Sequence, residues 1–223
     1  MQVAFVASTS LEELLQPDAR LWRGARAERV ALMGTPVGLQ PTAAVRVAWT
    51  NRKIGAVGEV DVAAVCDGQR LAFRLEWADP SENRELVETT AFPDAAAVLL
   101  PVAKGAPVVT MGAPGQAVNA WYWRADENGA GRQVVAEGIG TSRTVDVDLV
   151  KGQGLWKEGR WRLVIARALR VETAEPVAQL AAGQTTGFAV AVWEGGNGER
   201  AGIKAFSGEW RELALAAAPT ARR

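Results

Sequence analysis

The chain has 223 residues, 48% of them hydrophobic, and its 25 lysines and arginines balance its 25 aspartates and glutamates. This length and apolar share suffice for one substantial core, while the balanced charge lacks the basic field that non-specific nucleic-acid binding requires. We therefore expect a single domain over residues 1–223 that has no nucleic-acid partner.

Two residue types restrict the chemistry of the chain. It contains no histidine and one cysteine, Cys66. A lone thiol excludes an internal disulfide, a four-cysteine zinc site and an iron–sulfur cluster held by this chain alone. The missing histidine removes the commonest general base, the commonest metal ligand and the usual axial ligand of haem. Most hydrolytic and zinc-dependent functions are excluded, and Cys66 is expected to be a small buried residue.

The first segment, MQVAFVAST, lacks the basic flank and long apolar stretch of a secretory signal. No apolar run in the chain approaches the roughly 20 residues that span a bilayer. We expect no signal peptide and no membrane span. Directly afterwards, the pair Thr9-Ser10 predicts the N-cap of a short helix over residues 11–15.

Short strand patterns follow along most of the chain. Hydrophobic residues alternate with small or charged ones from Leu71 to Trp77, which predicts a half-buried strand. A valine-rich stretch over residues 57–66 precedes it, and Asp67-Gly68 supplies two positive-φ positions for a tight hairpin turn. The two segments should pair.

Further strands are predicted over residues 44–50, 118–124, 133–137, 144–150, 160–168, 186–193 and 209–215. One more helix is predicted over residues 93–100, and it is too short to organise a fold. The spacing of the strands favours an all-β protein, mainly an antiparallel β-sandwich with a few short accessory helices.

Two residues are candidate ligands of a metal or cofactor. Met111 lies in the segment TMGAPG, whose glycines and proline forbid regular structure and present the thioether from a loop. Lys204 follows a glycine-rich turn and lies among apolar residues. Taken alone, Met111 is better explained as core filling and Lys204 as a solvated surface lysine.

Five segments resemble a known family and appear in the same order. They are residues 92–98 (FPDAAAV), 106–112 (APVVTMG), 118–126 (VNAWYWRAD), 188–200 (FAVAVWEGGNGER) and 204–210 (KAFSGEW). They resemble the haem b-binding γ subunit of ethylbenzene dehydrogenase, and also the γ subunits of related periplasmic molybdoenzymes that act on dimethylsulfide, selenate or chlorate. The resemblance runs from about residue 22 to about residue 215 and is nearest to the ethylbenzene branch.

The resemblance implies a non-covalent haem b whose iron is held between a methionine and a lysine, here Met111 and Lys204. Residue types alone leave thioether, amine, thiolate, carboxylate and phenolate open as ligands, because histidine is absent and the chain has no Cys-x-x-Cys-His motif. A lysine binds iron only as the neutral amine, so an apolar pocket is expected around Lys204. Lys104, Arg124 and Arg132 are candidate partners of the haem propionates, and nothing in the sequence selects among them.

The family also implies the role of the chain and its partners. This chain would be a non-catalytic, electron-transferring γ subunit of a heterotrimer that oxidises a hydrocarbon anaerobically. The molybdenum cofactor and the iron–sulfur clusters would lie only in the catalytic α subunit and the β subunit. A c-type cytochrome or a similar protein would accept the electrons. The complex would work in the periplasm, with this chain exported alongside a partner that carries a twin-arginine signal.

Two alternatives stay open at the level of sequence. A cofactor-free β-sandwich would bind carbohydrate or another ligand through exposed tryptophans, of which the chain has nine candidates. A purely structural subunit would have lost its haem. Trp121 and Trp123, behind the Met111 loop, would pack in the core, at an interface or against the porphyrin.

Overall fold

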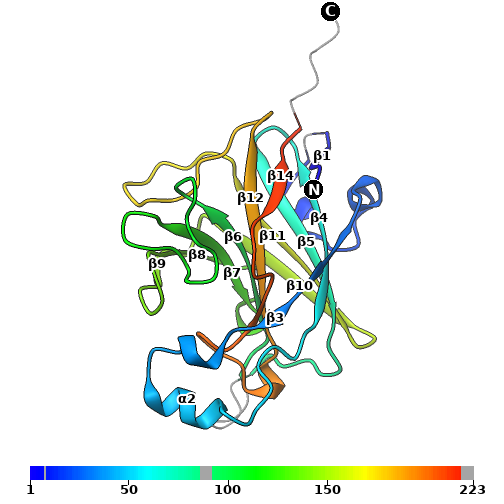
Figure 1. Ribbon diagram of the computed structural model, residues 1–223. Coiled ribbons are helices and arrows are strands. Elements are labelled where there is room, and N and C mark those ends of the chain that lie inside the picture. Colours follow the sequence, from blue (N-terminus) through cyan, green and yellow to red (C-terminus); the bar gives the residue numbers. More distant parts are fainter. Residues whose placement is uncertain (8, 86–91, 217–223) are drawn as a thin grey trace, which may run out of the picture.

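The computed structural model describes residues 1–7, 9–85 and 92–216, which form a sandwich of two β-sheets (Figure 1). Within these residues, the first sheet has six strands: β1 (Ala4–Phe5), β2 (Glu28–Ala31), β4 (Glu59–Cys66), β5 (Arg70–Ala78), β10 (Lys151–Lys157) and β11 (Arg160–Ala168). The second has eight: β3 (Met33–Gly34), β6 (Ala95–Pro101), β7 (Val118–Arg124), β8 (Arg132–Ala136), β9 (Arg143–Asp146), β12 (Thr185–Trp193), β13 (Ala205–Phe206) and β14 (Arg211–Ala214).

The strands of the first sheet run in the order β1-β4-β5-β11-β10, with β2 also paired to β4. Those of the second run β3-β13-β12-β6-β7-β8-β9, with β14 also paired to β12. All named strand pairs in the described residues are antiparallel except β1 with β4. The predicted all-β, mainly antiparallel sandwich is confirmed.

Helices are short accessories in the described part of the chain. They are α1 (Leu11–Leu15), α2 (Ala43–Trp49) and the 3-10 turns η1 (Arg20–Gly24), η2 (Val37–Leu39), η3 (Ala125–Glu127) and η4 (Gly195–Asn197). None of the helices in the described ranges has the length and apolar character that crossing a membrane requires.

Several predicted elements are confirmed closely. Helix α1 has the predicted bounds, and the Ser10 hydroxyl caps it by accepting a hydrogen bond from Glu13 N at 3.1 Å. Strands β7 and β11 also have the predicted bounds. Strand β9 ends earlier than predicted because the Asp146 carboxylate accepts bonds from the N–H groups of Asp148 and Leu149 and turns the chain.

The helix predicted over residues 93–100 is wrong, because this segment forms β6. Its six alanine, valine and leucine residues are buried on both faces between β12 and β7. A short apolar run of this kind fits a central strand as well as a helix, and pairing with two neighbours decides the outcome.

The strand predicted over residues 44–50 is also wrong, because the segment forms α2. Its N-cap, Thr42, accepts a hydrogen bond from Val45 N at 3.3 Å, and no neighbouring strand pairs with the segment among the described residues. A local cap thus outweighs the β propensity of two valines and a threonine.

The β4–β5 hairpin forms as predicted, but its turn differs. Only Gly68 has a positive φ, 88°, whereas Asp67 does not. The Asp67 carboxylate instead accepts bonds from the N–H groups of Gln69 and Arg70 at 2.9 and 2.7 Å, which closes a longer loop. Cys66, at the end of β4, is 1% exposed, as predicted.

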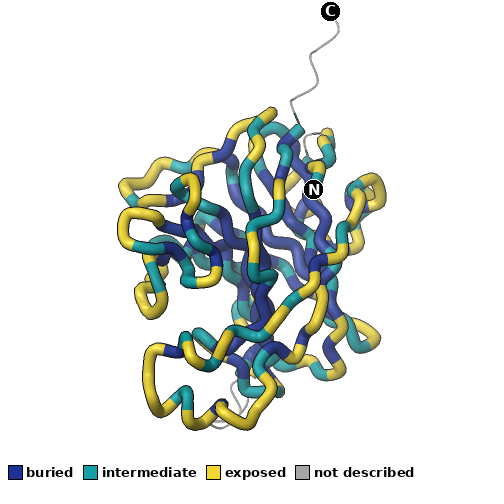
Figure 2. Tube along the Cα trace, viewed as in Figure 1, coloured by how far each residue is buried: buried dark blue, intermediate teal, exposed yellow. Residues whose placement is uncertain are grey.

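The main core lies between the two sheets, where much of the Cα trace in Figure 2 is buried, while the connecting loops are mostly exposed or partly buried. Trp121 and Trp123 point into this core and are fully buried. Because side chains alternate along a strand, Ala120 and Tyr122 of the same strand lie on the opposite, outer face of the second sheet. This outer face is apolar as well, so a second layer of packing is required there.

Candidate functional site

The outer face of the second sheet carries a pocket of about 350 Å³. Its floor is formed by small residues on neighbouring central strands, and the register places Ala191 opposite Ala97 and Ala97 opposite Tyr122. The next row along these strands includes Leu99 and Ala120. Alanine side chains leave apolar space between the larger side chains that line the pocket, where a ligand could bind.

Met111 lies on the wall of this pocket, in the turn between β6 and β7. Its φ is 59°, a left-handed conformation that is uncommon for a residue with a side chain. The loop is fixed by backbone hydrogen bonds from Met111 N to Val108 O at 3.0 Å and from Gly138 N to Met111 O at 3.0 Å. The thioether is therefore presented by a defined loop, as the sequence predicts.

Gly112 explains why the loop needs glycine directly after Met111. Its φ is 88°, and an added Cβ would lie 2.6 Å from Gln116 O and 2.8 Å from Ala136 O. No other residue fits this approach without moving two backbone segments.

Lys204 lies on the same pocket, just before β13, and is 7% exposed. The short segment that leads to it is held by Thr35, whose hydroxyl donates to Gly202 O at 2.6 Å and whose N–H donates to Lys204 O at 2.9 Å. Burial lowers the pKa of the Lys204 amine to about 8. Among the described residues, its Nζ has no ion pair and no hydrogen bond.

Tyr122 and Trp193 line the pocket next to Lys204. Their rings meet edge to face with centroids 5.4 Å apart, and Lys204 Nζ lies 5.4 Å from the Trp193 centroid. Burial raises the pKa of Tyr122 to about 12, so the phenol keeps its proton at neutral pH. Sequence reasoning missed both residues, although the alternation along β7 and β12 carries the signal: each faces away from the core side of its strand.

The lining of the pocket narrows the ligand types that the sequence left open. Among its described residues there is no aspartate, glutamate or cysteine. Of the ligand types that the sequence left open, the lining offers the Met111 thioether, the Lys204 amine and the Tyr122 phenol, which keeps its proton at neutral pH. The two residues that the sequence singles out, 93 positions apart in the chain (204 − 111), thus meet at one apolar pocket.

The three candidate propionate partners are separated by the structure. Arg132 lines the pocket and donates from Nε to Glu127 Oε2 at 2.9 Å. Arg124 instead lines a neighbouring hollow and pairs with Asp126, whereas Lys104 is exposed and lines neither space. Of the three, only Arg132 lines the same pocket as Met111 and Lys204.

All nine tryptophans lie in the described residues, and none is exposed. Seven are buried, while Trp156 and Trp210 are partly buried. Trp121 and Trp123 belong to the inter-sheet core and not to the pocket. The platform of exposed tryptophans required by the carbohydrate-binding alternative is absent from this structure.

Sequence comparison identifies relatives over most of the chain. The family model described as "Ethylbenzene dehydrogenase" matches residues 19–147 and 143–205. A protein of Haloferax mediterranei described as the haem subunit of a respiratory nitrate reductase is 35% identical over 92% of this chain and 69% of its own length. The chlorate reductase γ subunit of Ideonella dechloratans is 34% identical over 93% of this chain and 82% of its own.

A third relative is the dimethylsulfide dehydrogenase γ subunit of Rhodovulum sulfidophilum. It is 27% identical over 64% of this chain and 55% of its own length. The three relatives share the γ or haem subunit description, and two of them match nearly the whole chain.

Two solved structures share the fold. A family 9 carbohydrate binding module from Caldicellulosiruptor kristjanssonii superposes with a TM-score of 0.52 at 10% identity, covering 98% of this chain and 96% of its own. A protein from Bacteroides uniformis described as carbohydrate-binding gives 0.50 at 11% identity, covering 96% and 98%. At such low identity these similarities describe the sandwich architecture alone.

Proposed function

The chain belongs to the ethylbenzene dehydrogenase family, and from this premise we propose that it is the haem b-binding, electron-transferring γ subunit of a molybdoenzyme complex. The observation that carries the proposal is the pocket on the second sheet, which brings Met111 and Lys204 together over a floor of alanines. One relative is itself described as a haem subunit.

The residues present fit a haem held without covalent attachment. A porphyrin ring is largely apolar, and the pocket lining around Ala97 and Ala191 is largely apolar as well. The amine of the buried Lys204 side chain has no ion pair or hydrogen bond within the described residues, so in its neutral form its lone pair could bind an iron ion. Haem b supplies reversible one-electron transfer when bound, with methionine ligation favouring the reduced iron.

The burial of Lys204 favours its neutral amine form. Its pKa falls from 10.5 to about 8 because the ammonium is desolvated. At 1.36 kcal/mol per pKa unit, burial makes loss of the proton easier by about 3 kcal/mol. The neutral amine is the form that binds a metal, so the apolar wall contributes directly to ligation.

With Met111 and Lys204 both bound to its iron, the haem would supply one-electron transfer and would not bind oxygen or a substrate. Arg132, which lines the pocket and whose guanidinium is paired with Glu127, is the residue that we assign to a propionate.

The descriptions of the relatives support a place for this chain in a complex of several subunits. Two are named γ subunits, of chlorate reductase and of dimethylsulfide dehydrogenase. We assign this chain to a complex with a molybdenum-containing catalytic α subunit and an iron–sulfur β subunit, in the periplasm. A c-type cytochrome would receive the electrons. Export with a partner that carries a twin-arginine signal stays a prediction, which cell fractionation with and without that signal tests.

An absorption spectrum tests the proposal. The full chain, produced with an adequate haem supply and its partner subunits, should show a Soret band and sharp reduced α and β bands of a low-spin haem b. Met111→Ala and Lys204→Ala should each disturb this low-spin spectrum. The matched controls are Met33→Ala and Lys104→Ala, because both residues are exposed and lie outside the pocket.

The spectra test haem binding and the identity of the iron ligands separately. A low-spin spectrum unchanged in both ligand variants would retain haem binding and reject the assignment of Met111 and Lys204. A chain that takes up no haem under these conditions would reject the proposed function and favour a structural subunit.

A further inference from the structure

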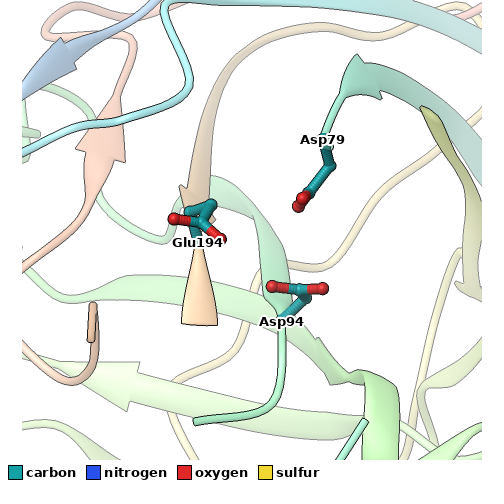
Figure 3. A group of neighbouring side chains, drawn as sticks. All are labelled: Asp79, Asp94 and Glu194. Carbon is teal, nitrogen blue, oxygen red and sulfur yellow. The ribbon is translucent and has the colours of Figure 1, made fainter. Parts of the chain in front are cut away.

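Three carboxylates from distant parts of the sequence meet at one end of the sandwich. Asp79 follows β5, Asp94 precedes β6 and Glu194 follows β12. One oxygen from each lies within 4.8 Å of the oxygens of the other two, and Figure 3 shows the three side chains around a common space. The Asp79 carboxylate points toward that space.

The cluster is buried and its charges are not compensated. Asp79 and Asp94 are fully buried, and Glu194 is partly exposed. No ion pair of the described residues includes any of the three. The sequence of residues 86–91, near Asp94 along the chain, contains no lysine or arginine. Three negative charges at this separation in a buried environment of low dielectric constant would repel one another strongly without a counter-ion.

Neutral donors orient the carboxylates without balancing them. Asp94 accepts hydrogen bonds from Gly195 N at 2.9 Å, from Asn83 N at 2.8 Å and from the Trp161 indole at 3.0 Å. Glu194 accepts one from Gly196 N at 3.0 Å. Burial, together with the charge of Asp79, raises the pKa of Asp94 to about 7. The site is preorganised for negative charge and lacks the positive partner.

One oxygen in the cluster has no partner. Asp79 Oδ1 accepts a bond from Ser81 N at 3.1 Å, but the buried Oδ2 has none within the described residues. Burial raises the pKa of Asp79, and the neighbouring Ser81 N–H and Trp77 indole offset part of this rise, although Trp77 Nε1 makes no hydrogen bond within the described residues. A buried carboxylate oxygen without a donor costs free energy unless a ligand binds it. This orphaned atom belongs to the side chain that points into the cluster.

Neutral oxygens extend the donor set on the exposed side. The Ser81 hydroxyl lies 2.9 Å from Asn83 Oδ1. A Cβ added to Gly196 would lie 2.8 Å from Glu194 Oε1 and 3.1 Å from Asn83 Oδ1, so these two oxygens border the same backbone. Gly196 itself is exposed, so this side of the cluster lies near the surface.

We propose that Asp79, Asp94 and Glu194 bind a divalent cation of the calcium type. The donors are all oxygens, the ligands of hard cations, and histidine and cysteine are absent from the cluster. Oxygens bound to one Ca²⁺ ion at about 2.4 Å lie no more than about 4.8 Å apart, and the three carboxylates meet this limit. Mg²⁺ fits less well because it is smaller and usually keeps several waters, for which a buried cluster has less room.

The cation would have a structural role. It would join the end of β5 in the first sheet to β6 and β12 in the second. Glu194 also begins the segment of residues 194–204 that ends at Lys204, so the same ion would anchor one end of that segment. The site is separate from the pocket, whose lining includes none of the three carboxylates.

Terbium luminescence tests the proposal on the purified full chain. Tb³⁺ replaces Ca²⁺ at oxygen sites, and Trp161, which is hydrogen-bonded to Asp94, is placed to sensitise its emission. We expect saturable emission on excitation of tryptophan at one equivalent, displaced by Ca²⁺ at lower concentration than by Mg²⁺. We also expect Ca²⁺ to raise the melting temperature and EDTA to lower it.

Two variants and one pH measurement complete the experiment. Asp79→Asn should weaken Tb³⁺ and Ca²⁺ binding by more than about tenfold, whereas Asp148→Asn, at an exposed carboxylate, should not change it. The titration of the wild-type protein with Ca²⁺ and EDTA tests cation binding even if Asp79→Asn does not fold. A melting temperature insensitive to both, but higher at pH 6 than at pH 8, would overturn the proposal and show that the carboxylates share protons instead.

Discussion

Lys204 Nζ lies 5.4 Å from the centroid of the Trp193 ring, over its face. An indole face offsets part of the cost of burying an ammonium, by about 0.5–2 kcal/mol. Among the described residues no carboxylate or hydrogen-bond acceptor reaches this nitrogen. Burial therefore destabilises the charged form of Lys204 in the folded protein, and this cost can be measured as a change in the free energy of unfolding.

Replacing Lys204 by methionine should stabilise the haem-free protein at neutral pH. The pKa of Lys204 is about 8 in the folded state and 10.5 when unfolded. Below pH 8 both states hold the proton, and burying the charge costs about 3 kcal/mol. Between pH 8 and 10.5 only the unfolded state holds it, so wild-type stability rises with pH. Lys204→Met should therefore be more stable by up to about 3 kcal/mol at pH 7, with the gap closing toward pH 10.5.

Urea unfolding at pH 7 and pH 10 checks this window. Lys104→Met is the matched control, because Lys104 is exposed and should show no difference between the two pH values. If the difference in free energy of unfolding between wild type and Lys204→Met stayed constant with pH, a destabilised buried ammonium at Lys204 would be ruled out.

Filling the floor of the pocket should block the cofactor without unfolding the chain. Ala97 lies opposite Ala191 on one side and Tyr122 on the other. Ala97→Leu puts three more carbon atoms into the space above the floor, and we expect haem content to fall at least about tenfold. Because Ala97 is 1% exposed, the larger side chain should also cost about 1–3 kcal/mol of stability, which lowers the thermal midpoint but leaves the chain folded. Ala44→Leu, on the exposed face of α2, is the control and should retain full haem content.

Gly112→Ala should loosen the Met111 loop. The added Cβ would meet two backbone oxygens at 2.6 and 2.8 Å at a φ of 88°, so the loop must move, at a cost of about 1–3 kcal/mol. Gly115→Ala tests the φ effect alone, because its φ is 73° and no atom lies within 4 Å of the added Cβ. The low-spin fraction of the reduced haem spectrum should drop in the first variant and stay near wild type in the second. Equal loss in both would place the sensitivity in the turn as a whole.

Arg132→Gln should weaken haem binding and lower its reduction potential. A charge-assisted hydrogen bond to a propionate contributes about 1.5–3 kcal/mol, or roughly a tenfold to hundredfold change in affinity. Loss of a nearby positive charge also favours the oxidised haem. Arg124→Gln removes an equivalent charge from the same sheet, at the neighbouring hollow. Haem titration and a redox titration of both variants separate the two arginines, and equal effects would argue against a specific role for Arg132.

The exclusions made from sequence depend on residue types and need no geometry. A chain without histidine cannot use histidine ligation, whatever its fold. Strong local signals also served well, such as the cap at Ser10 and the alternation along β5. The two failures, at β6 and α2, are short segments whose local preferences are ambiguous, so pairing with β12 and β7 decides one and a cap at Thr42 decides the other.

The sequence by itself determined the class of fold, the excluded chemistries and the two candidate ligands, because these depend on composition, local periodicity and motif resemblance. Only the tertiary structure decided that Met111 and Lys204 line one pocket, that Tyr122 and Trp193 line it with them and that Trp121 and Trp123 do not. It also brought Asp79, Asp94 and Glu194 together. The physical reason is that such contacts join residues far apart in the chain, and strand order and register, which local sequence encodes weakly, bring them within reach of one another.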